Sequence, residues 1–231
     1  MILTGHQPNY LPYAGFFHKI ALADEFVIVD NVQFVKRGPF GWIHRNKIRT
    51  PQGWDWLTIP TLTSGRYTQT IKEAKIDNSI PWRRKHWRSI EWNYNKAPFF
   101  KEYADKLKAV YDMEWESISG LNIHFIKILL DILDIKIPIH IASELDIEGR
   151  ATDLVINICK KLGATTYISG IHGRDYLEES RFKENNIELI YQEFKHPEYK
   201  QCQEGTFIPN LSVIDVLFNC GHKGLGIIMG K

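Results

Sequence analysis

The chain has 231 residues and a formal net charge of +2 at pH 7, so it can bury a sizeable core, and its overall charge calls for no polyanionic partner. Its three cysteines show no Cys-x-x-Cys spacing, which argues against a disulfide framework. It carries neither a secretory signal nor a run of ~20 apolar residues, so we expect a single cytoplasmic domain, residues 1–231, that does not enter the membrane.

The first thirty residues predict the unit around which the fold is built. Residues 1–5 read as a short apolar strand, residues 13–24 as an amphipathic helix with Pro12 at its first position, and residues 25–30 as a second apolar strand that ends in Asp30. A helix that joins two buried strands makes them parallel, with a right-handed crossover. The loop after the first strand therefore opens at the carboxyl edge of a Rossmann-like α/β sheet, where anionic ligands tend to bind.

This loop, residues 6–12, supplies the first candidate site residues. An unperturbed histidine has a pKa of ~6.5, which suits proton transfer near neutral pH. We therefore interpret His6 as a catalytic base, Asp30 as the carboxylate that orients His6 or the substrate, and Gln7 and Tyr10 as substrate-binding residues. The alternative for His6 is a turn histidine that hydrogen-bonds the backbone.

Residues 31–80 predict a small antiparallel β-hairpin insertion carried by the parallel sheet. Residues 42–48 and 54–59 read as two strands around a turn, and residues 71–76 as a third. Between Asp30 and Asp55 there is no acid, whereas Lys and Arg are frequent. The candidate phosphate-binding residues are therefore Lys36, Arg37, Arg45 and Lys47, with Asn46 among them; the alternative is a solvated basic hairpin.

Residues 81–135 predict a helical subregion that is interrupted near Pro98 and resumes as an amphipathic helix from Ser117. Trp82 and Trp87 alternate with cations, a composition that also occurs in nucleic-acid-binding proteins. Because acidic residues follow soon after, we favour a solvated helix face with two packed tryptophans.

A second βαβ-like unit follows. Residues 134–141 read as a connection and then a strand, 151–162 as a helix that Gly163 ends, 166–169 as a strand, 177–186 as a helix and 187–192 as a strand. The intervening Ser-Gly-x-x-Gly-Arg sequence allows backbone amides and one guanidinium to approach an anion. Ser169, Gly170 and Arg174 are thus candidate substrate-binding residues at the same sheet edge as His6.

The last segment, residues 193–231, contains a loop dense in hydrogen-bonding side chains. His196 is a further catalytic candidate there, and Tyr199 and Gln201 are substrate-binding candidates. Ser212 and Asp215 precede an apolar run with the spacing of a capping box, so we interpret both as helix-capping residues. The histidines show neither HxxxH nor HxxEH spacing, and we expect no metal site.

Seven segments spread over nearly the whole chain resemble the WbqC-like family. They are His6–Pro12, Phe26–Phe34, Arg45–Ile48, Trp56–Pro60, Tyr167–Gly170, His196–Gln201 and Leu211–Asn219. The resemblance implies a role in O-antigen or other surface-polysaccharide (lipopolysaccharide) biosynthesis, with glycine or acyl transfer to an aminosugar proposed for some members.

A second resemblance is to the HxGH nucleotidylyltransferases and pantothenate-synthetase-type ligases, which share the order strand, loop, helix, strand. Aligned at the helix start, Tyr13-Ala14-Gly15-Phe16 stands where those enzymes carry HxGH, so Gly15 is retained and both histidines are missing. This resemblance implies a nucleotide pocket, while the departure weakens the case for activation by ATP.

We therefore expect a cytoplasmic transferase that moves an acyl or glycyl group to a nucleotide-activated aminosugar, with His6 deprotonating the attacking amine. The expected partner is a small molecule, a nucleotide-sugar or nucleotide, and the sequence identifies no cofactor. Two alternatives stay open. One is an ATP-using nucleotidylyl- or adenylate-forming enzyme, and the other is a non-catalytic module that binds a nucleotide-sugar or transfer RNA.

Overall fold

A five-stranded sheet forms the centre of the protein, seen here in a computed structural model that describes residues 1–36, 38 and 41–231. All of its strands are parallel, in the order β5-β2-β1-β6-β7. The strands are β1 (Ile2–His6), β2 (Glu25–Ile28), β5 (Ile139–Ile141), β6 (Thr166–Ser169) and β7 (Glu188–Tyr191). This sheet, a two-stranded antiparallel sheet and several helices confirm the expected α/β class.

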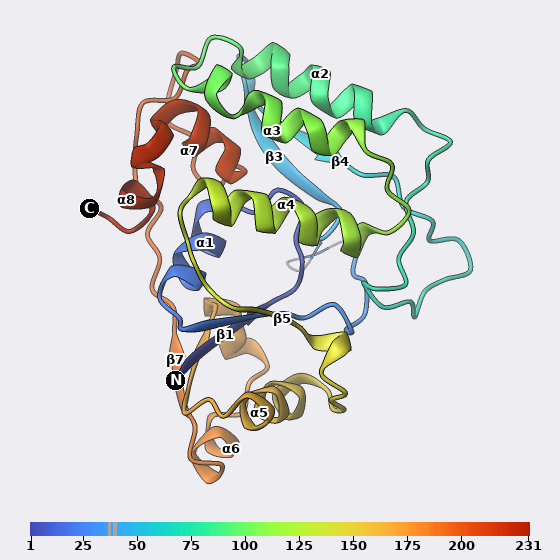
Figure 1. The fold of residues 1–231 in the computed structure, drawn as a ribbon, viewed down its shortest axis with the longest axis vertical. Helices are drawn as coiled ribbons and strands as arrows, with labels where there is room; N and C mark the ends of the chain where they lie inside the picture. Colours follow the sequence, from blue (N-terminus) through green and yellow to red (C-terminus); the bar gives the residue numbers. More distant parts are fainter. Residues whose placement is uncertain (37, 39–40) are drawn as a thin grey trace.

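Helices cover both faces of the sheet (Figure 1). The larger layer contains α1 (Ala14–Ala21), α2 (Trp82–Tyr94), α3 (Phe100–Asp112), α4 (Ile118–Ile132), α7 (Val213–Cys220) and α8 (Gly224–Ile228), and α5 (Ala151–Leu162) and α6 (Glu179–Glu184) lie on the opposite face. Short 3-10 turns occur at Ala142–Glu144, Ile171–Asp175 and Gly221–Lys223. Each face has its own apolar core, one built on α1 and α4 and the other on α5.

The strand order places a switch point between β1 and β6. The chain leaves β1 for α1 on one face of the sheet and leaves β6 for α6 on the other. The two helices contribute to different cores, α1 with Phe17 and α6 with Phe182. Adjacent connections that run to opposite faces leave a crevice at the carboxyl ends of the two strands, the usual ligand position in open α/β sheets.

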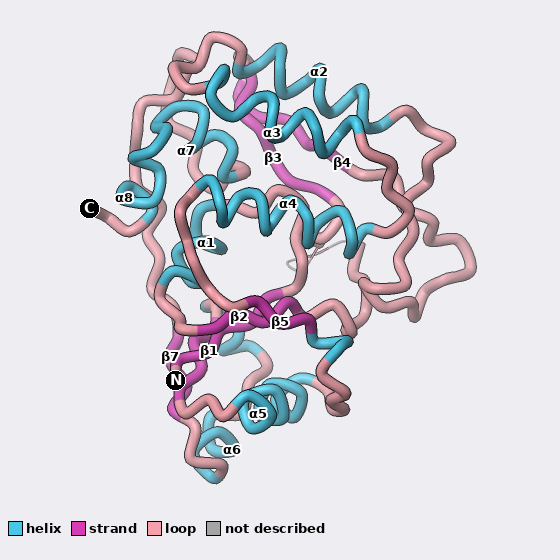
Figure 2. Tube along the Cα trace, viewed as in Figure 1, coloured by secondary structure: helices cyan, strands magenta, loops and turns pink. Residues whose placement is uncertain are grey.

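The connection from β2 to β5 holds the insertion. Its hairpin is β3 (Arg45–Thr50) paired with β4 (Gly53–Thr58) (Figure 2). The prediction of a third strand at residues 71–76 is wrong. Only isolated β-bridges occur there, and they join Thr61 to Ile76 and Lys75 to Ser117. Ile71, Ala74 and Ile76 are buried, so their apolar spacing reflects packing of an irregular segment rather than a strand.

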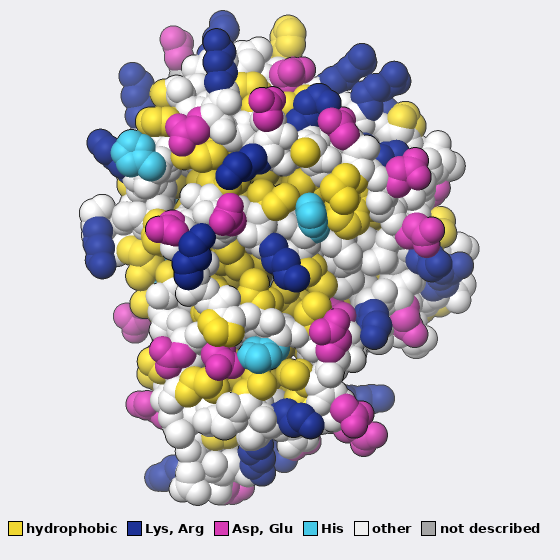
Figure 3. Space-filling model, viewed as in Figure 1, with side chains coloured by type: hydrophobic (Ala, Val, Ile, Leu, Met, Phe, Trp, Pro, Cys, Tyr) yellow, Lys and Arg dark blue, Asp and Glu magenta, His cyan; other side chains and the backbone are white. Residues whose placement is uncertain are grey.

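Helices α2, α3 and α4 follow the hairpin. The chain breaks between α2 and α3 around Pro98, and the Ser117 hydroxyl accepts a hydrogen bond from the Gly120 amide at the start of α4. Trp82 and Trp87 are buried, which confirms the packed-tryptophan interpretation. Figure 3 shows Lys, Arg, Asp and Glu side chains interspersed over the face that carries α2, α3 and α4.

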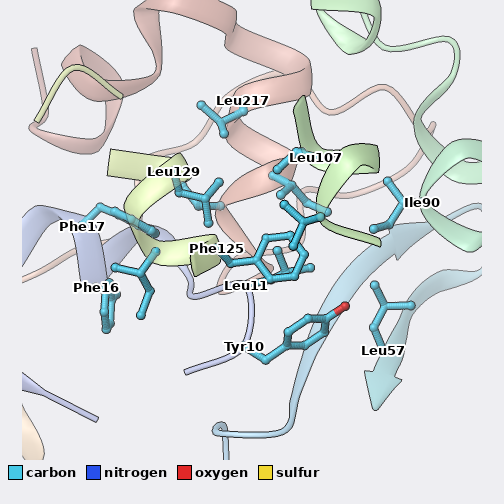
Figure 4. Close-up of a cluster of buried hydrophobic side chains, with 14 of the residues drawn as sticks. Tyr10, Leu11, Phe16, Phe17, Leu57, Ile90, Leu107, Phe125, Leu129 and Leu217 are labelled. Carbon is cyan, nitrogen blue, oxygen red and sulfur yellow. The ribbon is translucent and has the colours of Figure 1, made fainter. Parts of the chain in front are cut away.

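The core of the larger layer encloses the loop after β1. Figure 4 shows Tyr10 and Leu11 from this loop among side chains of α1, α4 and the hairpin, with Phe125 beside them and Phe16 and Phe17 further to the left. Two element boundaries differ from the sequence expectation: α1 begins after Tyr13, which leaves Pro12 in the loop, and α6 spans only Glu179–Glu184. Helix ends depend on caps and contacts that periodicity does not report.

Candidate functional site

Strands β1 and β6 separate at the switch point. Their pairing runs from Ile2–Thr166 to Thr4–Ile168 and stops there, while β1 stays paired with β2 as far as His6 and β6 with β7 as far as Ser169. His6 and Gln7 therefore continue from one side of the split and Ser169 and Gly170 from the other. We take this split as the candidate site.

His6 lies partly buried at the end of β1, with its ring centre 4.8 Å from that of Phe16. Its Nδ1 lies 3.0 Å from the Gln7 carbonyl oxygen. A carbonyl only accepts, so Nδ1 carries the hydrogen and Nε2 keeps its lone pair. Burial and the nearby Lys19 lower the pKa of His6 to about 3, well below the ~6.5 of an unperturbed histidine. The imidazole is neutral near pH 7, where it is a hydrogen-bonding group and a weak base.

Lys19 is a site residue that the sequence interpretation missed. It lies on α1, is only 3% exposed, and its amine donates to the Gly5 carbonyl oxygen at 2.9 Å. Burial lowers the pKa of Lys19 to about 7. The amine next to His6 is therefore the group of this pair that changes charge near neutral pH.

Aromatic side chains cover the first turn of α1. A Cβ atom at Gly15 would lie 2.4 Å from the Tyr13 ring and 2.7 Å from the Phe194 ring, so glycine is needed for these rings to pack there. Tyr13 also bridges to Ser212, and the Gln192 side-chain amide donates to the Gly15 carbonyl and lies 2.8 Å from His18 Nδ1. Aromatic rings and the Gln192 amide therefore pack against the first turn of α1, where no side chain caps the helix.

The loop at residues 7–13 is held in place by buried amides. Asn46 donates to the Leu11 carbonyl at 2.6 Å, and Asn122 donates to the carbonyls of Pro8 and Ile43, both at 2.7 Å. Leu11 has a φ of +42°, a backbone conformation that costs free energy for a residue with a side chain and persists only where the surroundings impose it. Asn46, a substrate-binding candidate, is therefore a structural support of the loop.

Tyr10, another substrate-binding candidate, is fully buried in the core. Its hydroxyl lies 2.9 Å from His86 Nδ1 and 2.5 Å from the Tyr111 hydroxyl. His86 Nε2 lies 3.1 Å from the Thr58 carbonyl, so Nε2 carries the hydrogen and Tyr10 donates to Nδ1. This buried network ties the loop to α2, α3 and β4.

Asp30 lies beyond the end of β2, on the side of β1 away from β6. Its two carboxylate oxygens accept hydrogen bonds from the Ser143 backbone amide and hydroxyl, at 3.0 and 2.9 Å. The carboxylate therefore joins the ends of β2 and β5. No hydrogen bond connects it to His6 in the described part of the chain.

On the β6 side of the split, the Ser169 hydroxyl is covered and the backbone at Gly170 is open. Ser169 is 4% exposed, and a Cβ atom at Gly173 would lie 2.0 Å from its hydroxyl oxygen, so Gly173 leaves room for that hydroxyl. At Gly170 a Cβ atom would meet no atom within 4 Å. Arg174 turns to the sheet edge, where its guanidinium lies 4.2 Å from the Tyr191 ring centre.

The hairpin presents a face of cations and tryptophans. The Arg45 guanidinium lies 4.3 Å from the Trp56 ring centre, and the Lys47 amine lies 4.1 Å from that of Trp54. In the described ranges neither cation forms an ion pair; both lie against tryptophan rings, and Arg45 Nε also donates to the Gly41 carbonyl. Lys36 is exposed, and Arg37 lies outside the described residues.

The segment after β7 forms an aromatic wall and a buried polar network. The His196 ring contacts Phe194, Tyr199 and Phe207, its Nδ1 bonds the Pro197 carbonyl, and burial lowers its pKa. Tyr199 and Gln201 both donate to Asp215, at 2.6 and 2.9 Å.

Asp215 corrects the capping-box interpretation. The Ser212 hydroxyl does cap α7, by accepting from the Ile214 amide at 3.4 Å. Asp215 is fully buried instead of capping, and its carboxylate accepts from the hydroxyls of Tyr94 and Tyr199 and the amide of Gln201. Burial raises its pKa, against the opposing effect of these donors.

The candidate residues therefore fall into several groups. His6, Gln7, Ser169 and Gly170 flank the split, Arg45 and Lys47 lie on the hairpin face, and Tyr199 and Gln201 belong to the Asp215 network. No hydrogen bond or ring contact among the described residues directly joins His6, Arg45, Ser169 and His196. The described residues contain no cluster of three or more His, Cys, Asp or Glu side chains that could bind a metal. Two surface hollows lie away from the split, one against α5 and one against α2.

A model of the WbqC-like protein family matches residues 7–227. A protein of Mycobacterium tuberculosis (strain ATCC 25618 / H37Rv), described as uncharacterized, is 36% identical over 219 residues, which cover 94% of this chain and 93% of the relative. No solved structure matches. In the described part of the chain, no helix has the length and apolar character needed to span a bilayer.

Proposed function

The chain belongs to the WbqC-like protein family, and from this and the site geometry we propose that it is a transferase in surface-polysaccharide (O-antigen) biosynthesis. The proposed reaction, placed in the cytoplasm, moves an acyl or glycyl group to the amine of a nucleotide-activated aminosugar. The observation that supports it best is the split between β1 and β6, the position where sheets of this topology take nucleotide ligands.

Each side of the split has a distinct role in this proposal. The open backbone at Gly170 lets the diphosphate of the substrate approach the strand end closely, and the uncompensated cations Arg45 and Lys47 attract it. The Nε2 lone pair of His6 accepts a hydrogen bond from the attacking amine and so orients it. His6 is thus a hydrogen-bond acceptor for the substrate in this proposal.

A thermal-shift panel tests the substrate class. We expect UDP-, dTDP- or GDP-sugars, aminosugars among them, to raise the melting temperature, because a ligand at 100 times its Kd adds about 2.7 kcal/mol to stability. ATP with magnesium and CoA thioesters complete the panel. Stabilisation by ATP with magnesium alone would favour the nucleotidylyl-transfer alternative. No response to any of these ligands would favour the binding-module alternative, and transfer RNA would be tested next. The logarithm of its binding constant should then fall linearly with the logarithm of the salt concentration, with a slope of about −0.7 for each phosphate contacted.

A substitution at Gly170 tests the location of the site. Gly170 has an ordinary extended φ of −68°, so Gly170→Val should change the melting temperature little while its side chain fills the open space of the split. We expect the affinity for the best nucleotide of the panel to fall at least ~10-fold, the equivalent of about 1.4 kcal/mol. Gly226→Ala, in α8, removes a glycine elsewhere and should bind as the native protein does. Native affinity in Gly170→Val would place the nucleotide outside the split.

A further inference from the structure

The Lys19 amine is a buried cationic group with few protein partners. Its side chain is almost completely covered, and the Gly5 carbonyl oxygen is its hydrogen-bond acceptor in the described part of the chain. An ammonium group has three N–H donors, so two remain available. No Asp or Glu side chain of the described residues forms an ion pair with it. The titratable group that interacts with it is His6 on β1.

The position of this amine follows from the strand geometry. Successive carbonyl groups of a strand point to opposite sides, and the His6 carbonyl accepts from the Val29 amide next to β2. The Gly5 carbonyl therefore points toward β6, one residue beyond the last β1–β6 pair at Thr4–Ile168. Lys19 bonds this carbonyl, so its amine lies where the two strands separate.

The neighbouring Ile168 carbonyl shows that a neutral hydrogen-bond donor can satisfy a backbone carbonyl in the split. The Thr4 hydroxyl donates to the Ile168 carbonyl at 2.7 Å, on the opposite strand of the same split. A neutral donor is sufficient there, whereas burying an amine that can carry a charge opposes folding. A lysine at the second carbonyl therefore indicates a use for the charge.

The first turn of α1, the usual anion-binding position in this fold, lies beside aromatic rings. The rings of Tyr13 and Phe194 pack there, with their centres 6.0 Å apart. Lys19 lies further along the same helix, on the side that faces β1. Opposite it, the backbone at Gly170 is open.

We propose that the Lys19 ammonium binds a phosphate oxyanion of the substrate in the split between β1 and β6, opposite the open backbone at Gly170. This inference rests on the proposed function, because it places a phosphate of the nucleotide at the same site. An oxyanion stabilises the charged form of the amine, and since burial holds the pKa of free Lys19 to about 7, binding near neutral pH takes up a proton.

Inorganic pyrophosphate is the probe that tests this inference without a nucleotide-sugar. The full chain is labelled with ¹³C at the lysine ε carbons, and the Lys19 signal is assigned as the one missing from Lys19→Met. We expect pyrophosphate to raise the pKa of this signal by at least about one unit, and calorimetry at pH 7 in buffers of different ionisation enthalpy to detect proton uptake. Sodium chloride at equal ionic strength should produce neither effect.

Two variants complete the experiment. Lys127→Met removes an exposed lysine of α4 and should bind pyrophosphate with native affinity and native proton uptake. Lys19→Arg keeps a permanent charge, so it should bind without proton uptake. Absence of pyrophosphate binding, or binding that leaves the Lys19 signal unchanged, overturns the inference. Because the readout is the amine itself, the inference and the proposed transferase activity can fail independently.

Discussion

Replacing Lys19 with methionine should remove most of the increase in stability that the native protein shows as the pH rises from 7 to 8.5. The physical reason is proton linkage. In the unfolded chain Lys19 titrates near its ordinary pKa of 10.5, whereas burial lowers its pKa to about 7 in the folded protein. Between these values the unfolded state binds a proton that the folded state lacks, so raising the pH favours folding.

The size of this effect follows from the titration. A full proton difference gives about 1.4 kcal/mol per pH unit, and with the folded amine half-titrated near pH 7 the gain by pH 8.5 is roughly 1.5 kcal/mol. Other groups act mainly outside this window. The histidines whose pKa values burial lowers, His6, His44 and His86 among them, add stability mostly below about pH 7. The cysteines, whose pKa values burial raises, reduce stability toward pH 9 and above.

Urea unfolding at half-unit steps from pH 6.5 to 8.5 provides the measurement. The native protein and Lys127→Met should show the same rise in unfolding free energy, because Lys127 is exposed. Lys19→Met should rise much less than the native protein over this range, with a constant offset from the unpaired Gly5 carbonyl. A flat native profile, or a native slope retained in Lys19→Met, would show that the buried amine does not titrate in this range.

The framework of the fold could be predicted from local pattern. The Met1–Asp30 segment gives strand, helix and strand because the apolar residues Phe16, Phe17 and Ile20 follow helical spacing between two apolar runs. Gly163 ends α5 with a φ of +72°, the left-handed conformation that favours glycine. The same reasoning predicted that the Ser169–Gly170 loop shares the sheet edge of His6, because both follow parallel strands.

The chemistry of the site could not be predicted in the same way, because it depends on contacts between distant segments. Lys19 lies on the flank of the apolar stripe of α1, where a helical wheel does not distinguish it from a solvated lysine. Its burial follows from the covering by β1 and the neighbouring core. For the same reason the low pKa of His6 is not visible in the loop sequence, because it comes from burial and from Lys19.

Asp215 is a second such residue, and replacing it with alanine should destabilise the protein by about 3–5 kcal/mol. Its carboxylate joins α7, on which it lies, to α2 through Tyr94 and to the chain after β7 through Tyr199 and Gln201. Removing the acceptor leaves three buried donors without a partner, and each unsatisfied group costs about 1–3 kcal/mol before relaxation. The Tyr94 hydroxyl also accepts from the Arg49 amide, so the loss extends to β3.

Matched variants separate this network from a general effect of losing an acid. Asp105→Ala, at an exposed position of α3, should change the unfolding free energy by less than about 0.5 kcal/mol. Asp215→Asn keeps one oxygen acceptor and should lose less stability than Asp215→Ala. Tyr199→Phe should cost about 1 kcal/mol alone and much less in the Asp215→Ala background, because its acceptor is already gone. Additive losses, or a loss below about 1 kcal/mol in Asp215→Ala, would mean that the carboxylate does not hold these segments together.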